Sequence, residues 1–311
     1  MMVGDREETE QWCLRVPARR GEEIRQALGS EGALDRTLKP RVEGNVLLLP
    51  VIEWREGAER YVFDPNPKRP ALPRHEMIGG IAVMQERDND GAARILASRP
   101  SLHTVLYPTS EVNGEYRTRR FDVLAGIPTT RTYVMEYGHR FTIDLSTAYF
   151  SPRLATERRR ITSLVQNGEI ILDMFAGVGP FAIALADRAK CVIAADINPG
   201  AIALMLENIF QNHTRTVLPI LADARRLTEI LPGQFDRIIM NLPLSGAEFL
   251  PPAFALARDG GHIHFYVLMS QESEHRQQIA DLGGEVICER VVRSYSPRQW
   301  HAVFDIRKKR G

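Results

Sequence analysis

Short apolar runs alternate with helical patterns through the second half of the chain. The apolar runs predict seven strands, at residues 170–174, 191–195, 217–221, 237–240, 261–266, 285–292 and 302–306. Strands that alternate with helices are typical of a mainly parallel sheet with helices on both faces. The pattern therefore predicts an α/β, Rossmann-like domain with seven strands.

Two smaller patterned regions precede this sheet. The first has strand-like residues 12–16 and 46–52 around a helix-like segment at 21–29. The second combines a helix-like segment, 90–98, with strand-like segments at 77–84, 104–107 and 119–124. Between the two regions, DPNPKRPALP holds four prolines and predicts a semi-rigid linker. We expect two small domains of α/β or α+β type, at residues 1–63 and 74–132 (an accessory domain), joined by the linker at 64–73, and one large domain at 133–311.

Composition places the chain among ordinary globular proteins. Hydrophobic residues make up 44% and charged residues 25% of the 311 positions, which excludes a disordered, collagen-like or coiled-coil chain. No apolar run reaches about 18 residues and the polar start lacks an apolar core, so neither a membrane span nor a signal peptide is expected. Cys13, Cys191 and Cys288 form no CxxC pair, which argues against a zinc site and favours a cytoplasmic location.

Charge is nearly balanced over the whole chain, but one segment is clearly positive. The formal net charge is +1, which by itself does not suggest a nucleic-acid partner. However, the cations are 35 Arg against 5 Lys, and residues 114–160 hold nine Arg against five acidic residues. The planar guanidinium suits phosphates and guanine edges, although a GC-rich genome would give the same bias. Residues 114–160 are therefore a candidate electrostatic footprint for RNA.

Three acidic residues end successive predicted strands. Asp173 opens DMFAGVGPF, a Gly-containing turn between a strand and a helix, where Gly177 and Gly179 let the backbone approach a ligand closely. Asp196 follows Gly177 by 19 residues, and Asp223 ends the third strand. Each acid alone is compatible with a helix cap or a turn. Because ligands bind outside the carboxyl ends of such strands, the three together predict a cofactor crevice.

The fourth strand ends in MNLP, with Asn241 and Pro243. An amide and backbone carbonyls at this place can accept hydrogen bonds from a planar nitrogen substrate, and a proline stiffens the turn and withholds an N–H group. A plain strand-to-helix turn is the alternative. Ahead of the sheet, Tyr149 precedes a Ser-Pro-Arg turn, and Glu157 lies in the first helical turn that follows. An acid there also suits the helix dipole, and the adjacent Arg run suits a solvated face.

The glycine turn departs from a nicotinamide site because residue 182 is Ala, so there is no GxGxxG. Asp173-x-x-x-Gly177-x-Gly179 instead resembles motif I of class I S-adenosylmethionine (AdoMet) methyltransferases. Together YFSPRLATER, LDMFAGVGPF, DINPGA, MNLP and RVVRSYSPR resemble the archaeal and eukaryotic-type tRNA (guanine-37 N1)-methyltransferase family over about residues 75–311. The first 55 residues resemble the small N-terminal domain of that family.

The resemblance implies a function and a set of site residues. The chain would be a monomer that methylates N1 of the guanosine 3′ of the tRNA anticodon, contacting the anticodon loop and, through its N-terminal domain, the elbow. Glu157 would be the general base, Arg117 would stabilise guanine O6, and Asn241 and Pro243 would hold the methyl donor and the base. AdoMet would contact Tyr149, Arg158, Asp173, Phe175, Gly177, Gly179, Asp196, Ile197, Asp223, Ala224 and Asn241. RNA would contact Arg117, Arg119, Arg120, Ser151, Pro152, Arg153 and Arg298.

The chemistry agrees with these roles. Guanine N1 carries a proton at neutral pH, so a carboxylate must remove it as methyl transfer proceeds. Charge then develops on O6, which an arginine can stabilise. AdoMet supplies the electrophile, so no metal is required. Alternatives are a member that also methylates C7 of the wyosine precursor 4-demethylwyosine, the aminocarboxypropyl transferase of wybutosine synthesis, and a non-catalytic RNA-binding protein on the same fold. A small-molecule or protein methyltransferase would not need the N-terminal modules.

Overall fold

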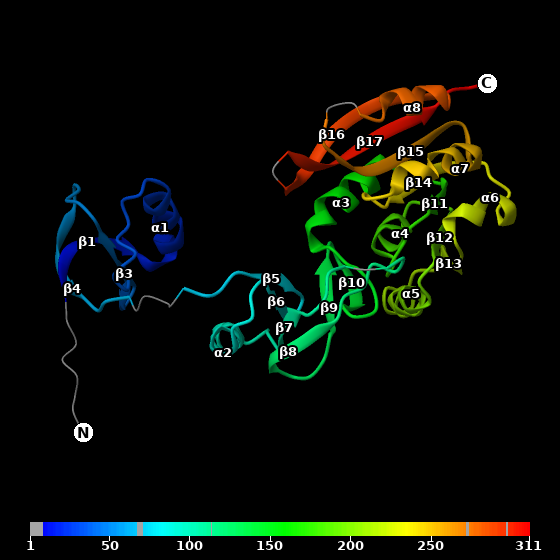
Figure 1. Ribbon diagram of the computed structural model, residues 1–311. Helices are drawn as coiled ribbons and strands as arrows, with labels where there is room; N and C mark the ends of the chain where they lie inside the picture. The colour runs from blue at the N-terminus through cyan, green and yellow to red at the C-terminus, as the bar shows by residue number, and fades with distance from the viewer. Residues whose placement is uncertain (1–8, 67–70, 113, 272–273, 297) are drawn as a thin grey trace. The chain divides into compact units, whose positions relative to one another are not determined.

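The computed structural model describes residues 9–66, 71–112, 114–271, 274–296 and 298–311, and its elements are labelled in Figure 1. The chain divides into two compact units, Met1–Ala71 and Leu72–Gly311. The predicted linker spans this division, and its residues 67–70 lie outside the described ones. The further division of the second unit at residue 132 stays a prediction.

The first unit is a four-stranded antiparallel sheet with one long helix. Its strands are β1 (Thr9–Pro17), β2 (Arg41–Glu43), β3 (Val46–Val51) and β4 (Ala58–Phe63), in the order β2-β3-β1-β4. The short helix η1 (Ala18–Arg20) leads into α1 (Gly21–Ser30). Successive residues of β3 point to opposite faces of the sheet, so Leu48 and Leu49 enter two separate apolar clusters, and the larger of these includes Leu28 of α1.

The second unit begins with a four-stranded sheet in the order β5-β6-β7-β8. Its elements are β5 (His75–Ile78), β6 (Ile81–Met84), α2 (Asn89–Ser98), β7 (Thr104–Pro108) and β8 (Phe121–Gly126). The prediction of one strand over residues 77–84 is wrong, because Gly79 and Gly80 turn the chain between two antiparallel strands. Gly79 has a φ of +57°, and a Cβ there would lie 2.1 Å from the Tyr133 carbonyl oxygen.

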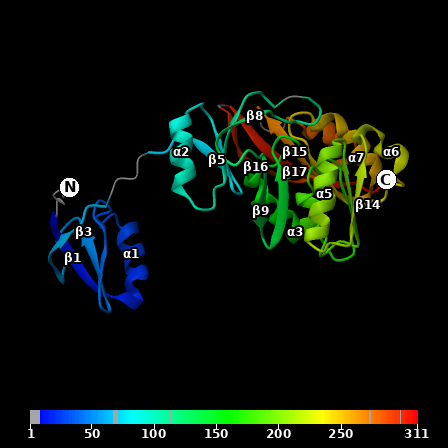
Figure 2. The same cartoon turned by 90° about the horizontal axis from the view of Figure 1, so that it is seen from below.

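A two-stranded hairpin that the sequence pattern did not predict follows. It consists of β9 (Arg131–Glu136) and β10 (His139–Asp144), joined at Tyr137 and Gly138, which both have positive φ. Figure 2 shows it beside α5, and Asn208 of α5 donates to the Thr142 carbonyl and accepts from the Thr142 N–H. The hairpin therefore packs against the helical layer of the large sheet.

The large sheet has seven strands in the order β13-β12-β11-β14-β15-β17-β16. The strands are β11 (Ile170–Asp173), β12 (Cys191–Asp196), β13 (Val217–Leu221), β14 (Phe235–Asn241), β15 (Ala257–Met269), β16 (Gly284–Ser296) and β17 (Gln299–Lys308). The first five in spatial order are parallel, and β17 runs antiparallel to both β15 and β16. The predicted α/β fold with a seven-stranded sheet is confirmed. The strand order reverses between β11 and β14, which is where such sheets bind ligands.

Helices cover both faces of this sheet. The elements before and between the strands are η2 (Pro152–Leu154), α3 (Ala155–Leu164), α4 (Pro180–Leu185), α5 (Pro199–Gln211), η3 (Ala224–Arg226), α6 (Leu227–Ile230), η4 (Gly246–Phe249), α7 (Leu250–Leu256) and α8 (Arg276–Asp281). One apolar cluster holds side chains of α3, α4 and α5, and a second on the other face holds those of α6, α7 and α8. The crevice at the carboxyl ends of the strands thus opens between two packed layers.

A buried chain of charged and polar groups ties α3 to the sheet. Arg237 on β14 donates to both carboxylate oxygens of Glu169, at 2.7 and 2.9 Å, and to Nε2 of His264, at 2.6 Å. Because a guanidinium can only donate, Nε2 accepts and Nδ1 of His264 carries the proton, which it donates to Asp305 at 2.6 Å. Asp305 also accepts from Arg160 of α3, at 2.6 and 3.2 Å.

The two carboxylates in this chain are held ionised. Burial alone would raise the pKa of Glu169, and the hydrogen bonds and charge of Arg237 bring it below its usual value. Burial likewise raises the pKa of Asp305. The hydrogen bonds and charges of His264 and Arg160 together have the larger, opposite effect and bring the pKa well below its usual range. Each group therefore stabilises the fold above its ordinary pKa, and that stabilisation is lost as the pH falls toward the folded-state value.

We predict that Glu169→Ala lowers the free energy of unfolding of the second unit by about 3 kcal/mol, since it leaves the Arg237 guanidinium buried without its carboxylate. Glu229→Ala is the matched control, because the Arg226–Glu229 pair is exposed and is worth less than about 1 kcal/mol. Urea unfolding of both variants measures the difference, and equal losses would contradict the prediction.

Candidate active site

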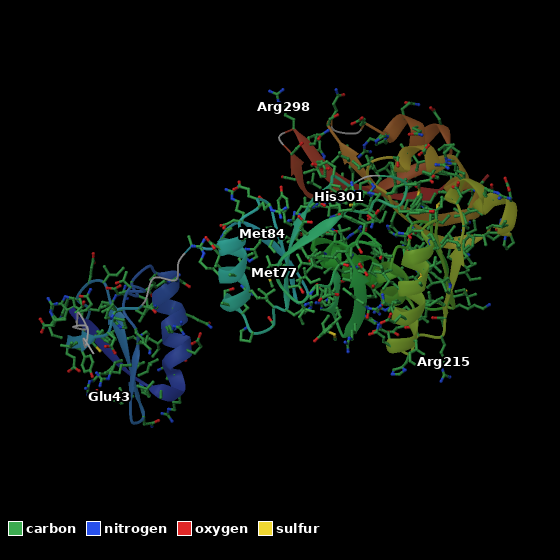
Figure 3. The ribbon with its side chains drawn as sticks, turned by 60° about the horizontal axis from the view of Figure 1, so that its bottom comes forward. Glu43, Met77, Met84, Arg215, Arg298 and His301 are labelled. Carbon is green, nitrogen blue, oxygen red and sulfur yellow. The ribbon has the colours of Figure 1, made fainter. Side chains whose placement is uncertain are left out.

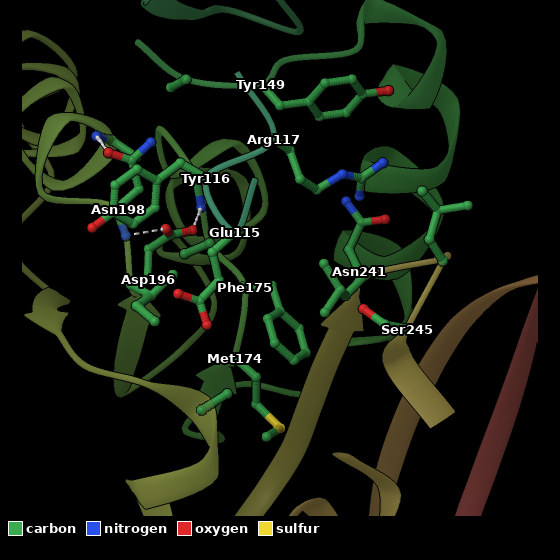
Figure 4. Close-up of a pocket in the computed structure, with 18 of the residues that line it drawn as sticks. Glu115, Tyr116, Arg117, Tyr149, Met174, Phe175, Asp196, Asn198, Asn241 and Ser245 are labelled. Carbon is green, nitrogen blue, oxygen red and sulfur yellow. Dashed lines mark hydrogen bonds between the residues drawn. The ribbon is translucent and has the colours of Figure 1, made fainter. Parts of the chain in front are cut away.

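A cavity of about 330 Å³ lies at the carboxyl ends of β11, β12 and β14. Figure 4 shows its wall, to which Phe175, Asp196, Asn241 and Tyr149 contribute from four separate segments of the chain. We call it the first cavity. Strand ends meet there because parallel strands bring their carboxyl ends to one edge. The sequence prediction of a crevice at this edge agrees with the position of the cavity.

The Asp196 carboxylate organises the turn that forms one side of the first cavity. It accepts the Gly177 N–H at 2.7 Å and the Asn198 N–H at 2.8 Å, and so joins the turns after β11 and β12. Burial raises the pKa of Asp196 while these backbone amides lower it, and burial has the larger effect. Gly179 has a φ of +85°, and a Cβ there would lie 2.7 Å from Met205 Cγ, so only glycine fits the turn.

Asp173 lies beneath this turn rather than in the cavity wall. Its side chain is fully buried, and neither carboxylate oxygen has a hydrogen-bond partner of full geometry in the described part of the chain. Burial raises the pKa of Asp173 to about 7, and the charge of Asp196 adds to the rise, although the nearby amides of Phe175 and Ala182 lower it. Asp173 is therefore placed to support the turn, as is Gly179, which also lies outside the wall.

All the other residues predicted to bind the cofactor line the first cavity. They are Tyr149, Arg158, Phe175, Gly177, Asp196, Ile197, Asp223, Ala224 and Asn241. Asp223 caps η3 by accepting the Arg225 N–H at 2.9 Å, and its other oxygen pairs with the Arg225 guanidinium. Arg158 pairs with Glu136 of β9 through two hydrogen bonds of 2.6 and 2.8 Å, so its charge is already balanced.

A second cavity, of about 280 Å³, adjoins the first. Arg117, Tyr149 and Asn241 line both, while Pro243 and Arg119 line only the second. The guanidinium of Arg117 lies 5.0 Å from the centre of the Tyr149 ring, and in Figure 4 it points toward the Asn241 amide. Nε of Arg117, Nε of Arg119 and Oδ1 of Asn241 are buried without a hydrogen-bond partner in the described part of the chain. Such groups indicate a polar ligand.

Glu157 lies behind the wall and lines neither cavity. Its carboxylate is 4% exposed, and it accepts from Arg160 at 2.9 Å and from the Tyr266 hydroxyl at 3.3 Å. Arg290 lies 3.6 Å from its other oxygen. The structure thus surrounds this carboxylate with donors, and the predicted base role stays a prediction.

The residues predicted to contact RNA fall into two groups. Arg117, Arg119, Ser151 and Arg153 line the second cavity. Pro152, Arg120 and Arg298 line neither cavity, and Figure 3 shows Arg298 extending from the tip of the β16–β17 hairpin. Arg153 is engaged with Glu76 at 2.9 Å.

The sequence analysis missed two residues of the second cavity, Arg293 and His301. Nε of Arg293 and both ring nitrogens of His301 are buried without a hydrogen-bond partner among the described residues. The last predicted strand began at residue 302, whereas β17 begins at Gln299, so His301 was left outside the sheet. The motif RVVRSYSPR contains Arg293 and was the available signal, but it did not indicate which arginine faces the cavity.

Within the described ranges, no three His, Cys, Asp or Glu side chains gather into a group that could hold a metal ion. None of the described helices is long and apolar enough to cross a membrane.

Comparisons with known families place both units. A model of the TRM5/TYW2 methyltransferase domain matches residues 132–289. A model of the tRNA methyltransferase 5 N-terminal domain matches residues 13–59. The first match covers the strands that border the two cavities as far as Glu289 of β16, and the second covers most of the first unit.

Three known proteins are informative. The tRNA (guanine(37)-N(1))-methyltransferase Trm5b of Pyrococcus abyssi is 38% identical over 95% of this chain and 98% of the relative. A solved complex of aTrm5 and tRNALeu superposes with a TM-score of 0.73 at 30% identity, covering 95% of this chain and 99% of that one. The tRNA(Phe) (4-demethylwyosine(37)-C(7)) aminocarboxypropyltransferase of Methanocaldococcus jannaschii is 30% identical over 76% of this chain and 98% of its own length.

Proposed function

The chain belongs to the TRM5/TYW2 methyltransferase family, and we propose that it transfers the methyl group of AdoMet to N1 of guanosine 37 in tRNA. The observation that carries this proposal is the junction of the two cavities at Arg117, Tyr149 and Asn241. A cofactor in the first cavity and a nucleobase in the second would meet at these side chains.

The match to the N-terminal domain supports this activity over the related ones. Residues 13–59 match a domain described for tRNA methyltransferase 5, and Trm5b of Pyrococcus abyssi covers 95% of the chain. The aminocarboxypropyltransferase relative is covered almost entirely by this chain yet leaves about a quarter of the chain unmatched. The proposed reaction is therefore the one whose relatives account for both units.

The residues of the first cavity fit AdoMet. Asp196 retains free lone pairs for ribose hydroxyls after accepting the two backbone amides, and Phe175 and Ile197 offer apolar surface for an adenine ring. Gly177, which has a positive φ and lines the first cavity, presents backbone without a side chain to the cofactor. AdoMet supplies an electrophilic methyl group, and the chain has to position the acceptor and manage the proton.

In the second cavity, Arg117 is placed to donate to guanine O6, where negative charge develops when N1 loses its proton. The unpaired Oδ1 of Asn241 can accept from a guanine N–H group. The Pro243 carbonyl accepts the Leu268 N–H at 2.8 Å, so the turn that follows β14 is anchored to β15. These contacts require the target base to leave its stacked position in the anticodon loop.

Glu157 is the proposed acceptor of the N1 proton. In the structure Arg160 and Tyr266 donate to its carboxylate, so base catalysis requires Glu157 to exchange one of these hydrogen bonds for guanine N1–H. Tyr266 pairs with Asn241 across β14 and β15, which places it next to the proposed base-binding amide. Tyr266 therefore links Glu157 to the strand pair that carries Asn241.

The direct test is methylation of an unmodified tRNA transcript, followed by mass spectrometry of the nucleosides. We expect N1-methylguanosine at position 37 and none when guanosine 37 is replaced by adenosine. The assay also separates the two related activities, since methylation at C7 and transfer of an aminocarboxypropyl group give products of different mass or position. Either product without N1-methylguanosine would contradict the proposal.

We predict that Glu157→Gln keeps AdoMet affinity and lowers the single-turnover rate at least about a hundredfold, because a neutral amide cannot take the N1 proton. Asp305→Asn is the matched control, since Asp305 is the other carboxylate that pairs with Arg160. A base role predicts a smaller loss of rate in the Asp305 variant than in the Glu157 variant, because Asp305→Asn disturbs the ion pair that holds α3 but leaves the proposed base in place. Equal losses of rate in the two variants would show instead that Glu157 acts by positioning Arg160.

We predict that deleting residues 1–66 weakens the preference for tRNA with a folded elbow over an anticodon stem-loop. The first unit is compact by itself and matches the N-terminal domain model, so its removal leaves the second unit with both cavities. Rates on the two RNAs, compared between the full chain and the deletion variant, measure the preference. The same ratio in both proteins would argue against an elbow contact.

A further inference from the structure

His301 has a buried ring that the proposed mechanism does not use. Its side chain is 2% exposed, and neither ring nitrogen has a hydrogen-bond partner among the described residues. The ring packs against Tyr266, with 5.9 Å between the ring centres, and Figure 3 labels it within the large unit. Burying two polar nitrogens without partners costs free energy. A ligand that supplies the partners would recover that cost.

The sheet itself presents His301 to the second cavity. Pro243 accepts the Leu268 N–H, Leu268 pairs with His301 across β15 and β17, and His301 pairs with Arg293 across β17 and β16. All four residues line the second cavity. They form one row across the sheet that starts at the turn after β14, so the imidazole belongs to the same wall as Pro243.

The imidazole of His301 is neutral at physiological pH. Burial, together with the positive charges of Arg293 and Arg117, lowers the pKa of His301 to about 4. A neutral imidazole has one nitrogen that donates and one that accepts. The ring therefore offers the second cavity an acceptor that a protonated histidine would not have.

Among the buried side-chain atoms of this wall that lack a partner, donors outnumber acceptors. Nε of Arg117, Arg119 and Arg293 are buried donors without a partner. Within the described part of the wall, the buried side-chain acceptors without a partner are Oδ1 of Asn241 and a ring nitrogen of His301. Oxygens of a bound nucleotide thus have several possible donors, while its N–H groups have two buried side-chain acceptors.

We propose that His301 is a positioning residue that accepts a hydrogen bond from the 2-amino group of the target guanine. The proposal rests on the function proposed above. Guanine donates through N1–H and the 2-amino group, and only the 2-amino group still donates after N1 has lost its proton. The two hydrogens of that amino group match in number the two acceptors, Asn241 and His301. A purine without the amino group leaves the imidazole buried and unsatisfied, which lowers its reactivity.

The test combines removal of one substrate group, the 2-amino group of guanine, with removal of one side chain, the imidazole of His301. Full-length tRNA with guanosine 37 is compared with ligated tRNA that carries inosine 37, which lacks only the 2-amino group, in single-turnover reactions with each protein. The wild-type chain is expected to methylate inosine about ten- to hundredfold more slowly. In His301→Ala the rate on guanosine falls while the rate on inosine stays near the wild-type value, so the preference drops about tenfold. His301→Gln restores part of it, because its amide oxygen can accept.

His264→Ala is the matched control, since His264 is equally buried on the same sheet but has Arg237 and Asp305 as partners. It is expected to lower stability without changing the preference for guanosine. Equal losses on both substrates in His301→Ala would show a packing role and overturn the proposal.

The wild-type comparison needs no variant to fold, and equal rates on guanosine and inosine overturn the proposal by themselves. If the wild-type chain forms no N1-methylguanosine at position 37, the proposed function is wrong. This proposal, which rests on that function, is then wrong as well.

Discussion

Arg160 determines where α3 lies on the large sheet. Its guanidinium pairs with Glu157 of its own helix and with Asp305 of β17, and Asp305 is held in turn by His264. A shift of α3 would leave buried charges without partners, which costs several kcal/mol. Arg158 on the same helix is tied to β9 through Glu136. Because the turn before α3 lines both cavities, their shape depends on these ion pairs.

The two cavities at the edge of the sheet are held in shape in different ways. The first cavity is organised by backbone amides that converge on Asp196, so its geometry follows from the strand ends and two glycines. The second is organised by side chains from distant segments: Arg117 comes from residues between β7 and β8, Asn241 from β14 and His301 from β17. These segments come together only once the whole second unit has folded, so binding of the base depends on the fold more than binding of the cofactor does.

The same distinction explains what the sequence could predict. Buried parallel strands are continuous apolar runs, so β11 to β14 were predicted within two residues of their observed ends, and the acids that follow the first strands could be identified. The predicted run at 261–266 covers only the middle of β15. The β9–β10 hairpin was missed because its outward residues Tyr133, Met135 and Tyr137 are apolar but exposed, which removes the polar–apolar alternation expected of such a strand. The burial of Glu157 outside the cavity lining could not be predicted, because it depends on the contact between Arg160 and Asp305, which are 145 residues apart in the sequence.

The buried arginines of the second unit fall into two groups that differ in what they contact. Arg158, Arg160 and Arg237 are buried with carboxylates, so they add nothing to the net charge and hold the fold together. The buried Nε atoms without a partner in the described part of the chain belong instead to Arg117, Arg119 and Arg293, which all line the second cavity. A net charge of +1 is therefore compatible with an RNA substrate, since the unpaired donors are concentrated at one wall. Burial and the same positive charges keep His301 neutral, so a cavity rich in donors retains the acceptor that a guanine amino group requires.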